Sequence, residues 1–372
     1  MAAPPPAVPC LTLVSGVTYS RRVPEKSTLV ALESNSTLTQ VMRMDWGLVQ
    51  GPVRRELAQV DRQLVRLFRS PIAIVNAVGL HFLSTRGKKF RPTLLLLVSR
   101  LEGPARRPHV TSATVVELIH AAALIHDDSV DKSSLRRGLP TVNHMWNDDV
   151  SIVVGDFLYS KAFETLVREE LLRAMRVLAD VTHHMAIGEA LEIDFEGKLD
   201  LEESQYFDVI AAKTASLMGG ACEIGAASPN GDSPNRTRAR AQRFRRFGHA
   251  VGMAFQITDD VIDFLGHPSE TGKKLGTDLR EGKVTLPLIG ALATLKSKKR
   301  ERLVVLAAKR KLGKPEFKEL VGLIEEGDGF TYAMSKARLY ADQAKRLLGP
   351  EPDGSVKSAL GHAVDYAVGR TR

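Results

Sequence analysis

The chain has 372 residues, of which 52 are Lys or Arg and 43 are Asp or Glu, so its formal net charge is +9. At 44% hydrophobic and 26% charged residues, the composition is that of a globular protein with a packed core, in one large domain or two small ones. No stretch approaches the roughly 18 to 20 consecutive apolar residues of a membrane-spanning helix, which excludes an integral membrane protein. Cys10 and Cys222 lie far apart, which excludes a disulfide scaffold and a structural zinc site.

The first 43 residues are rich in Pro, Ser and Thr and show no sustained helical or alternating pattern. This predicts a poorly ordered tail over residues 1–43. The segment lacks the basic region and clean apolar stretch of a secretory signal, and Glu25 and Glu33 argue against an organellar transit peptide. With two reduced thiols also expected, we predict a cytoplasmic location.

The rest of the chain carries a helical pattern. From about residue 44, apolar residues recur at spacings of three and four, whereas alternating β-branched runs are scarce. This predicts an all-α fold with a single domain, residues 44–372, because neither a composition shift nor a repeat marks a second domain. The predicted helical segments, each one or two helices, are 48–68, 111–128, 151–181, 204–227 and 237–265. Breakers between them are 86–92, 136–140, 228–235 and 267–276.

The sequence HDDSVD lies near the end of one apolar helix and contains Asp127, Asp128 and Asp131. Residues four apart lie one above the other on a helix, so Asp127 and Asp131 point the same way, roughly 5 to 6 Å apart. A cation relieves the repulsion between them, and oxygen ligands without Cys or His select a hard ion such as Mg²⁺ over zinc. Taken alone, the motif is explained better as a solvated acidic helix end than as a metal site.

A second acidic motif, FQITDDVID, repeats this arrangement with Asp259, Asp260 and Asp263 on an otherwise apolar helix. Gln256 shares their face. Because unpaired buried carboxylates are costly, two such clusters in core-type helices indicate a function. If the two helices face each other across a bundle, their carboxylates converge on one cavity and can hold several Mg²⁺ ions around a polyphosphate.

Basic residues occur in the loops beside both motifs. Arg offers a planar fork to phosphate oxygens and Lys a point charge, so the set suits recognition of a diphosphate, although each residue alone is more typical of a surface cation. The members are Lys88, Lys89, Arg91, Arg136, Arg137, Lys273, Lys274 and Lys283. A further basic run at 236–246 is interpreted as a solvated helix face in preference to a membrane-surface patch or a nucleic-acid contact, and we expect no nucleic-acid partner.

These motifs resemble, in order and spacing, those of trans-polyprenyl diphosphate synthases, the polyprenyl synthetase family. The matching segments are RGKKFRP, ELIHAAALIHDDSVDKSSLRRGLPTVN, GDFLYS, AAKTASL, FQITDDVIDF and GKKLGTDLREGKVTLP. The likeness covers essentially everything from about residue 44 to the C-terminus. It implies one large helix bundle around a deep central cavity, usually as a homodimer. It also implies a prenyltransferase that condenses isopentenyl diphosphate head to tail (1′–4) onto an allylic diphosphate, making an all-trans polyprenyl diphosphate.

The resemblance further implies a role for each matching residue. The Mg²⁺ ligands, for three ions per site, would be Asp127, Asp131, Asp259 and, more remotely, Asp263. The allylic diphosphate would contact Arg136, and isopentenyl diphosphate would contact Lys88, Arg91, His120 and Arg137. The carbocation and the departing diphosphate would be steadied by Lys213, Thr214, Gln256 and Lys273, with Lys283 nearby. Breaking the allylic C–O bond leaves a cation and a highly charged pyrophosphate, which Mg²⁺ and cationic side chains stabilise.

Two small residues precede the first aspartate motif, where short-chain members of the family often carry a bulky side chain. Ala122 and Ala123 leave the wall below Asp127 open. This favours a medium or long product, hexaprenyl to decaprenyl, over farnesyl or geranylgeranyl diphosphate. A bulky residue one or two turns lower would close the tunnel instead.

Two other functions share parts of this pattern. A non-catalytic subunit of a heteromeric prenyl synthase typically loses an aspartate motif, whereas both motifs are complete here. A class I terpene cyclase uses the same metal chemistry but needs no isopentenyl diphosphate site, so GKKFRP and His120 argue against it. Glu192 stands where many long-chain members carry Gln, and the sequence assigns it no role.

Overall fold

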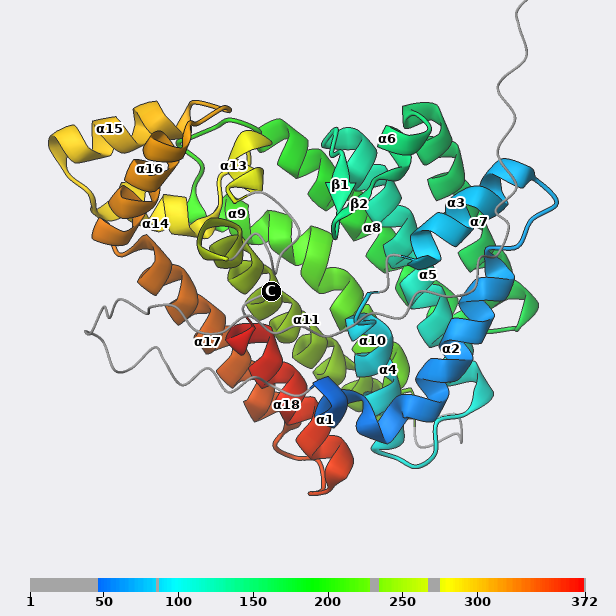
Figure 1. Ribbon diagram of the computed structural model, residues 1–372. Coiled ribbons are helices and arrows are strands. Elements are labelled where there is room, and N and C mark those ends of the chain that lie inside the picture. The colour runs from blue at the N-terminus through cyan, green and yellow to red at the C-terminus, as the bar shows by residue number, and fades with distance from the viewer. Residues whose placement is uncertain (1–45, 85–86, 228–233, 267–274, 371–372) are drawn as a thin grey trace, which may run out of the picture. The chain divides into compact units, whose positions relative to one another are not determined.

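The computed structural model describes residues 46–84, 87–227, 234–266 and 275–370, with the backbone alone for 234–237 (Figure 1). These residues belong to one compact unit, Met42–Arg372. The predicted tail over residues 1–43 lies outside the described residues, so its disorder stays a prediction.

The first half of this unit consists of helices and one small hairpin. The hairpin pairs β1 (Leu135–Arg136) with β2 (Leu139–Pro140) in antiparallel register. The helices are α1 (Trp46–Gln50), the 3₁₀ turn η1 (Gly51–Val53), α2 (Arg54–Leu67), α3 (Ala73–Ser84), α4 (Phe90–Arg100), α5 (Arg107–Val130), α6 (Val142–Met145), α7 (Asp148–Arg168) and α8 (Leu172–Phe195).

The second half is helical throughout its described residues. It comprises α9 (Glu203–Ile210), the π-helical turn η2 (Ala211–Ala215), α10 (Ser216–Gly225), α11 (Pro234–Leu265), α13 (Thr277–Arg280), α14 (Leu286–Thr294), α15 (Ser297–Ala307), α16 (Lys314–Glu326), α17 (Gly329–Leu348) and α18 (Ser355–Gly369). The all-α prediction is therefore confirmed, and every predicted helical segment coincides with one or more helices.

Two of the predicted breakers can be compared with the structure. The breaker at 86–92 extends too far, because α4 begins at Phe90 and holds Pro92 in its first turn. Proline is tolerated there since its missing N–H would have no helical partner. The breaker at 136–140 folds as the hairpin, in which Arg137 and Gly138 have φ angles of 52° and 78°. Positive φ at both positions is what a tight two-residue turn of this hand requires.

Buried apolar side chains form two clusters that share α11 and α17. Phe244 and Phe247 of α11 lie in the first cluster, with α1 to α8, α10 and α18. Ile257 and Phe264 of the same helix lie in the second cluster, with α9 and α13 to α16. In Figure 1, α11 runs through the centre of the described unit with α17 beside it. This long helix therefore connects the two halves and carries the second aspartate motif at its C-terminal end.

The contact between α10 and α11 depends on glycine. A Cβ atom added at Gly248 would lie 2.3 Å from the carbonyl oxygen of Met218 and 2.7 Å from Sγ of Cys222. Both distances are far below van der Waals contact. Gly248 therefore allows the two helix backbones to approach each other directly.

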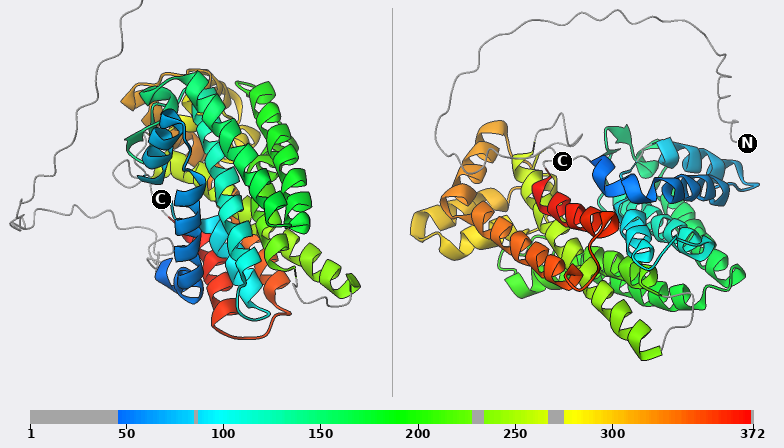
Figure 2. Two further views of the ribbon diagram at one scale, coloured as in Figure 1. Left: turned by 90° about the vertical axis from the view of Figure 1, so that its right-hand side faces the viewer. Right: turned by 90° about the horizontal axis from the view of Figure 1, so that it is seen from below.

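Helix α5 is the central helix of the first cluster. By length and composition it could cross a membrane, yet 72% of its apolar window is buried inside the protein. It packs against α2, α4 and α7 (Figure 2). Among the described residues no other helix meets the same test, and the burial of α5 is that of a core helix.

The basic run at 236–246 lies on the N-terminal part of α11. Arg240 and Arg243 both pair with Glu351, which is 8% exposed, and their guanidinium groups lie 4.9 and 5.1 Å from the centre of the Phe244 ring. Arg240 also lies 2.9 Å from Glu102. The interpretation as a solvated face is wrong for these two arginines, which attach α11 to the segment that joins α17 and α18.

Candidate active site

A cavity of about 1510 Å³ is lined by residues of α2 to α5, α7 to α11, α13, α18 and η2 and by the loops that flank α4, β1 and α13. All but two of the predicted site residues line it. These are Lys88, Arg91, His120, Ala123, Asp127, Asp131, Arg136, Arg137, Lys213, Thr214, Gln256, Asp259, Asp263 and Lys283. Lys273 lies outside the described residues. Ala122 is completely buried in the first apolar cluster and is absent from the described lining, so Ala123 alone of the pair faces the cavity.

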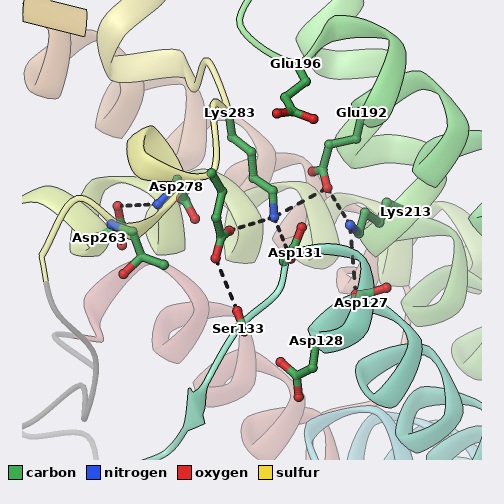
Figure 3. A network of polar contacts seen from close by, with 12 residues as sticks. Asp127, Asp128, Asp131, Ser133, Glu192, Glu196, Lys213, Asp263, Asp278 and Lys283 are labelled. Carbon is green, nitrogen blue, oxygen red and sulfur yellow. Dashed lines mark hydrogen bonds and ion pairs between the residues drawn. The ribbon is translucent and has the colours of Figure 1, made fainter. Parts of the chain in front are cut away.

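The first aspartate motif occupies the C-terminal end of α5, and its members point in different directions (Figure 3). Asp127 and Asp131 face the cavity, as their spacing predicts. Asp128 is buried instead, and its two oxygens accept bonds of 2.7 and 2.8 Å from the guanidinium of Arg136. Arg136 was expected to contact the allylic diphosphate; in this structure its fork is bound to Asp128. This pair fastens the hairpin to the end of α5.

Two lysines lie among the carboxylates of this motif and of α8. Nζ of Lys213 lies 2.6 Å from Glu189, 2.6 Å from Glu192 and 3.9 Å from Asp127. Nζ of Lys283 lies 2.9 Å from Asp131, 3.0 Å from Glu281 and 3.5 Å from Glu192. Glu192 therefore bridges the two lysines, as Figure 3 shows. We call this group, five carboxylates around two ammonium groups, the Lys213/Lys283 cluster.

Burial determines the electrostatics of this cluster. It raises the pKa of Asp127 from 3.8 to about 7, an effect that the nearby Lys213 opposes and Glu189 reinforces. Burial lowers the pKa of Lys213, but Asp127, Glu192 and Glu189 outweigh it and raise that pKa above its ordinary value. The pKa of Lys283 is raised against burial in the same way, by Glu192, Glu281 and Asp131. Both lysines therefore remain charged.

The second aspartate motif lies at the C-terminal end of α11, and its three carboxylates again have different surroundings. Asp259 is about half exposed and lies 3.1 Å from the guanidinium of Arg370. Asp260 is buried. Asp263 accepts backbone N–H bonds of 3.1 Å from Thr277 and 3.2 Å from Asp278, so it fixes the start of α13. Of the three, Asp259 presents its carboxylate most openly to the cavity.

The donor set suits a hard cation. Only oxygen ligands face the cluster, and Oε1 of Glu189 is buried without a hydrogen-bond partner. Within the described part of the chain, no three Asp, Glu, His or Cys side chains already stand close enough together to hold a metal ion. The positive charge between the carboxylates is that of Lys213 and Lys283. A divalent ion would therefore have to draw Asp127 and Asp131 toward itself.

The basic residues of the GKKFRP segment gather at another part of the cavity. Nη1 of Arg91 donates to Nε2 of His120 at 3.0 Å. Burial holds the pKa of His120 well below its ordinary value, so the ring is neutral and accepts this bond. Burial also lowers the pKa of Arg91 to about 10, although the neighbouring Glu117 opposes it. Nε of Arg91 is buried without a partner, which suggests a polar ligand at this position.

The part of the wall opposite the first motif is formed by η2 and α11. Oγ1 of Thr214 donates to Oε1 of Gln256 at 2.9 Å, and Nε2 of Gln256 donates to Oδ1 of Asp260 at 2.8 Å. The hydroxyl of Tyr206 donates to Oδ2 of Asp260 at 2.6 Å. Thr214 and Gln256, both expected to steady the carbocation, are joined by a direct hydrogen bond.

Below Asp127 the lining becomes less polar. Ala123 of α5, Tyr159 of α7 and Met185 and Ala186 of α8 all line the cavity. Burial raises the pKa of Tyr159 to about 12, so the phenol is neutral. The lining thus includes the large side chains of Tyr159 and Met185 as well as the small Ala123 and Ala186.

The family model described as polyprenyl synthetase matches residues 72–324. The chain belongs to the polyprenyl synthetase family.

Relatives of this polyprenyl synthetase make products of different lengths, according to their names. The chain is 32% identical over 323 residues to the all-trans-nonaprenyl-diphosphate synthase (geranyl-diphosphate specific) of Rhodobacter capsulatus. The aligned residues cover 87% of this chain and 97% of that protein. The chain is 33% identical over 307 residues to heptaprenyl diphosphate synthase component 2 of Geobacillus stearothermophilus, covering 82% and 92%. The polyprenyl synthase of Caulobacter crescentus CB15, solved with calcium and isoprenyl diphosphate, superimposes with a TM-score of 0.83 at 33% identity, covering 88% of this chain and 98% of that one.

Membership in the family decides several of the predictions. The polyprenyl synthetase is a prenyltransferase with the all-α isoprenoid synthase fold, so both the reaction class and the fold class are confirmed. The terpene cyclase alternative is rejected. The roles of individual residues stay predictions, supported by their common position on one cavity.

Some residues of the site were not identified from the sequence. Glu117, Glu189, Glu281, Tyr206 and Arg370 all line the cavity, and each contacts or faces a predicted site residue. Glu189 had a visible signal, since it lies three residues before Glu192 on one face of α8. Tyr206 and Arg370 had none, because they reach the site only through the packing of α9 and α18 against α11.

Proposed function

We propose that this polyprenyl synthetase is a Mg²⁺-dependent enzyme that condenses isopentenyl diphosphate head to tail (1′–4) onto an allylic diphosphate, making an all-trans polyprenyl diphosphate. One observation carries the proposal. The aspartate motifs of α5 and α11 line the same cavity as the buried arginine of GKKFRP and the Lys213/Lys283 cluster. Acidic groups for a metal and basic groups for a diphosphate thus share one space.

Asp127, Asp131 and Asp259 would hold Mg²⁺, and the predicted number is three ions per site. Their oxygens, and the buried Oε1 of Glu189 that has no hydrogen-bond partner, support a hard cation. When bound, Mg²⁺ neutralises the pyrophosphate leaving group as the allylic C–O bond breaks. Lys213 and Lys283 add fixed positive charge beside the departing oxygens.

Isopentenyl diphosphate would bind at Lys88, Arg91, His120 and Arg137. His120 is neutral and occupied by Arg91, which supports a role in orienting the arginine and the diphosphate rather than one as a base. The double bond of isopentenyl diphosphate attacks C1 of the allylic cation. The proton lost in the last step passes to the released pyrophosphate, so no side chain has to accept it.

The allylic cation requires electron-rich groups and exclusion of water. The side-chain oxygen of Gln256 and the backbone carbonyls of Lys213 and Thr214 would supply the negative dipole ends. The apolar wall below Asp127 would keep water from trapping the cation.

For the product we propose a medium or long chain, hexaprenyl to decaprenyl. The small Ala123 on the cavity wall supports this length, whereas Tyr159 adds a large side chain to the same lining. The relatives' names range from short-chain and geranylfarnesyl to heptaprenyl, octaprenyl and nonaprenyl diphosphate synthases, so the names do not select a length. A geranylgeranyl or farnesyl product is the alternative, and it would require Tyr159 to close the tunnel.

For the assembly we propose a homodimer. Large apolar side chains are exposed at both ends of α7, with Ile152 at 50% and Val153 at 64% near its start and Val167 at 57% near its end. A second copy of the chain that covers α7 would bury them. A heteromeric synthase is the alternative, since one relative is named as component 2 of a heptaprenyl synthase. The cytoplasmic location stays a prediction.

Incubation of the purified protein with Mg²⁺, labelled isopentenyl diphosphate and separate allylic primers tests this proposal. We expect a product ladder that ends at one dominant length after dephosphorylation and mass spectrometry. Light scattering on the same sample measures the number of subunits. No incorporation with any primer, by protein that is folded by circular dichroism, would contradict a self-sufficient synthase and favour the heteromeric alternative.

A further inference from the structure

Asp260 differs from every other carboxylate of the two motifs that faces the cavity. It is 2% exposed, and each of its oxygens accepts one hydrogen bond, from Nε2 of Gln256 and from the hydroxyl of Tyr206. Both oxygens are thus engaged by side chains of the protein itself. This indicates that Asp260 acts on Gln256 and not on a metal.

The direction of each hydrogen bond in this group follows from its chemistry. The NH₂ group of Gln256 donates to Oδ1 of Asp260 at 2.8 Å, as an ionised carboxylate requires. Burial raises the pKa of Asp260 well above its ordinary value, and the hydrogen bonds from Tyr206 and Gln256 oppose this by stabilising the ionised form. The oxygen of the Gln256 amide then faces the other way, where it accepts from the hydroxyl of Thr214. Burial raises the pKa of Tyr206 well above its ordinary value, so the phenol keeps its proton and donates. A reversed amide could still donate to the hydroxyl of Thr214, which also accepts, but it would turn its oxygen toward Asp260 and lose the bond to that carboxylate.

The group also connects three elements. Tyr206 lies on α9, Thr214 lies in the π-helical turn η2, and Gln256 and Asp260 lie one turn apart on α11. Tyr206, Asp260 and Gln256 all border the cavity. The amide of Gln256 is therefore contacted by Thr214 of η2 on one side and by Asp260 of its own helix on the other, and Tyr206 of α9 holds Asp260 in turn.

We propose that Asp260 and Tyr206 are positioning residues that hold the Gln256 amide with its oxygen, and not its nitrogen, toward the allylic cation. This inference rests on the proposed function. The negative end of the amide dipole stabilises a cation, whereas an N–H group at the same place repels it. Asp260 thus contributes to the reaction through Gln256, without touching the substrate.

The test uses Tyr206→Phe, which deletes one oxygen atom, and Asp260→Asn, which can donate as well as accept and so no longer fixes the amide. The matched control is Tyr332→Phe, because Tyr332 donates its hydroxyl to Glu203 outside the described cavity lining. For both test variants we expect kcat to fall about tenfold with unchanged KM for either substrate, as for other residues that orient a contacting group. The control should behave as wild type.

A second readout distinguishes orientation from a general loss of structure. The probes are an ammonium analogue of the allylic cation and its neutral carbon isostere, each bound in the presence of Mg²⁺ and pyrophosphate. In both test variants we expect the ammonium analogue to bind about tenfold more weakly and the neutral isostere to bind as in wild type.

Equal weakening of both probes, or wild-type kcat in Tyr206→Phe, would overturn the proposal. If Asp260→Asn fails to fold by circular dichroism, Tyr206→Phe decides alone. Wild-type protein that binds neither probe and turns over no substrate would refute the proposed function itself. An active wild type with unaffected variants refutes only the role of Asp260 and Tyr206.

Discussion

Asp127→Asn should stabilise the metal-free protein at alkaline pH while it removes activity. Burial raises the pKa of this carboxyl from 3.8 to about 7. Because the pKa of the folded state lies above that of the unfolded state, the protonated carboxyl stabilises the fold. That contribution is fully present below pH 3.8 and is lost as the pH rises through about 7. Asparagine has the same shape and no charge to desolvate.

The magnitude follows from the pKa difference. At about 1.4 kcal/mol for each pH unit, the increase from 3.8 to about 7 corresponds to about 4 kcal/mol. The free energy of unfolding should therefore be up to about 4 kcal/mol higher in Asp127→Asn than in wild type at pH 8. This gap should close as the pH falls toward 4.

Urea unfolding in the presence of EDTA, followed by circular dichroism from pH 4 to pH 8, measures this difference. The adjacent Asp128→Asn is the control with the opposite expectation. Its carboxylate holds Arg136 in a buried two-bond pair, and removing one partner of such a pair costs about 3 to 5 kcal/mol. Substitution of the two neighbouring aspartates should thus change the free energy of unfolding in opposite directions at pH 8. A loss of stability in Asp127→Asn, or a gap that does not vary with pH, would refute the argument.

Three other substitutions test the site and the fold. Ala123→Phe should shorten the product seen by mass spectrometry, because it narrows the lining beside Tyr159; an unchanged length would mean that another residue limits the chain. Asp259→Ala should abolish Mg²⁺-dependent turnover with little change in helical circular dichroism, and near-wild-type kcat would contradict its role as a ligand. Gly248→Ala should lower the free energy of unfolding by about 2 kcal/mol in urea, since its Cβ would overlap Met218; wild-type stability would show that α10 and α11 can separate without penalty.

The helical periodicity of the sequence predicted those features that depend on a single helix, namely which residues share a face and which helices are buried. The spacing of Asp127 and Asp131 correctly predicted that both would face one cavity from α5, and the buried helices followed from their apolar pattern. Convergence of the second motif on the same cavity was expected only if the two helices face each other across the bundle. These features are repeated or contiguous along the chain, so they can be recognised in the sequence.

The partners of individual side chains followed no such pattern. Arg136 reaches Asp128 because a tight turn at Arg137 folds the hairpin back onto α5. Arg370, near the C-terminus of the chain, reaches Asp259 of α11. Contacts of this kind depend on how distant helices pack, and no spacing in the sequence encodes that packing.

The Lys213/Lys283 cluster has a consequence for how the protein matures. In small zinc domains, folding and metal binding are one event, because the core is too small to fold without the free energy of metal binding. Here two ammonium groups of the chain already lie among the carboxylates, so the protein can complete its fold before any divalent ion is present. Removal of the ion should be reversible for the same reason. A chelated sample should regain activity as soon as Mg²⁺ is restored, with no refolding step.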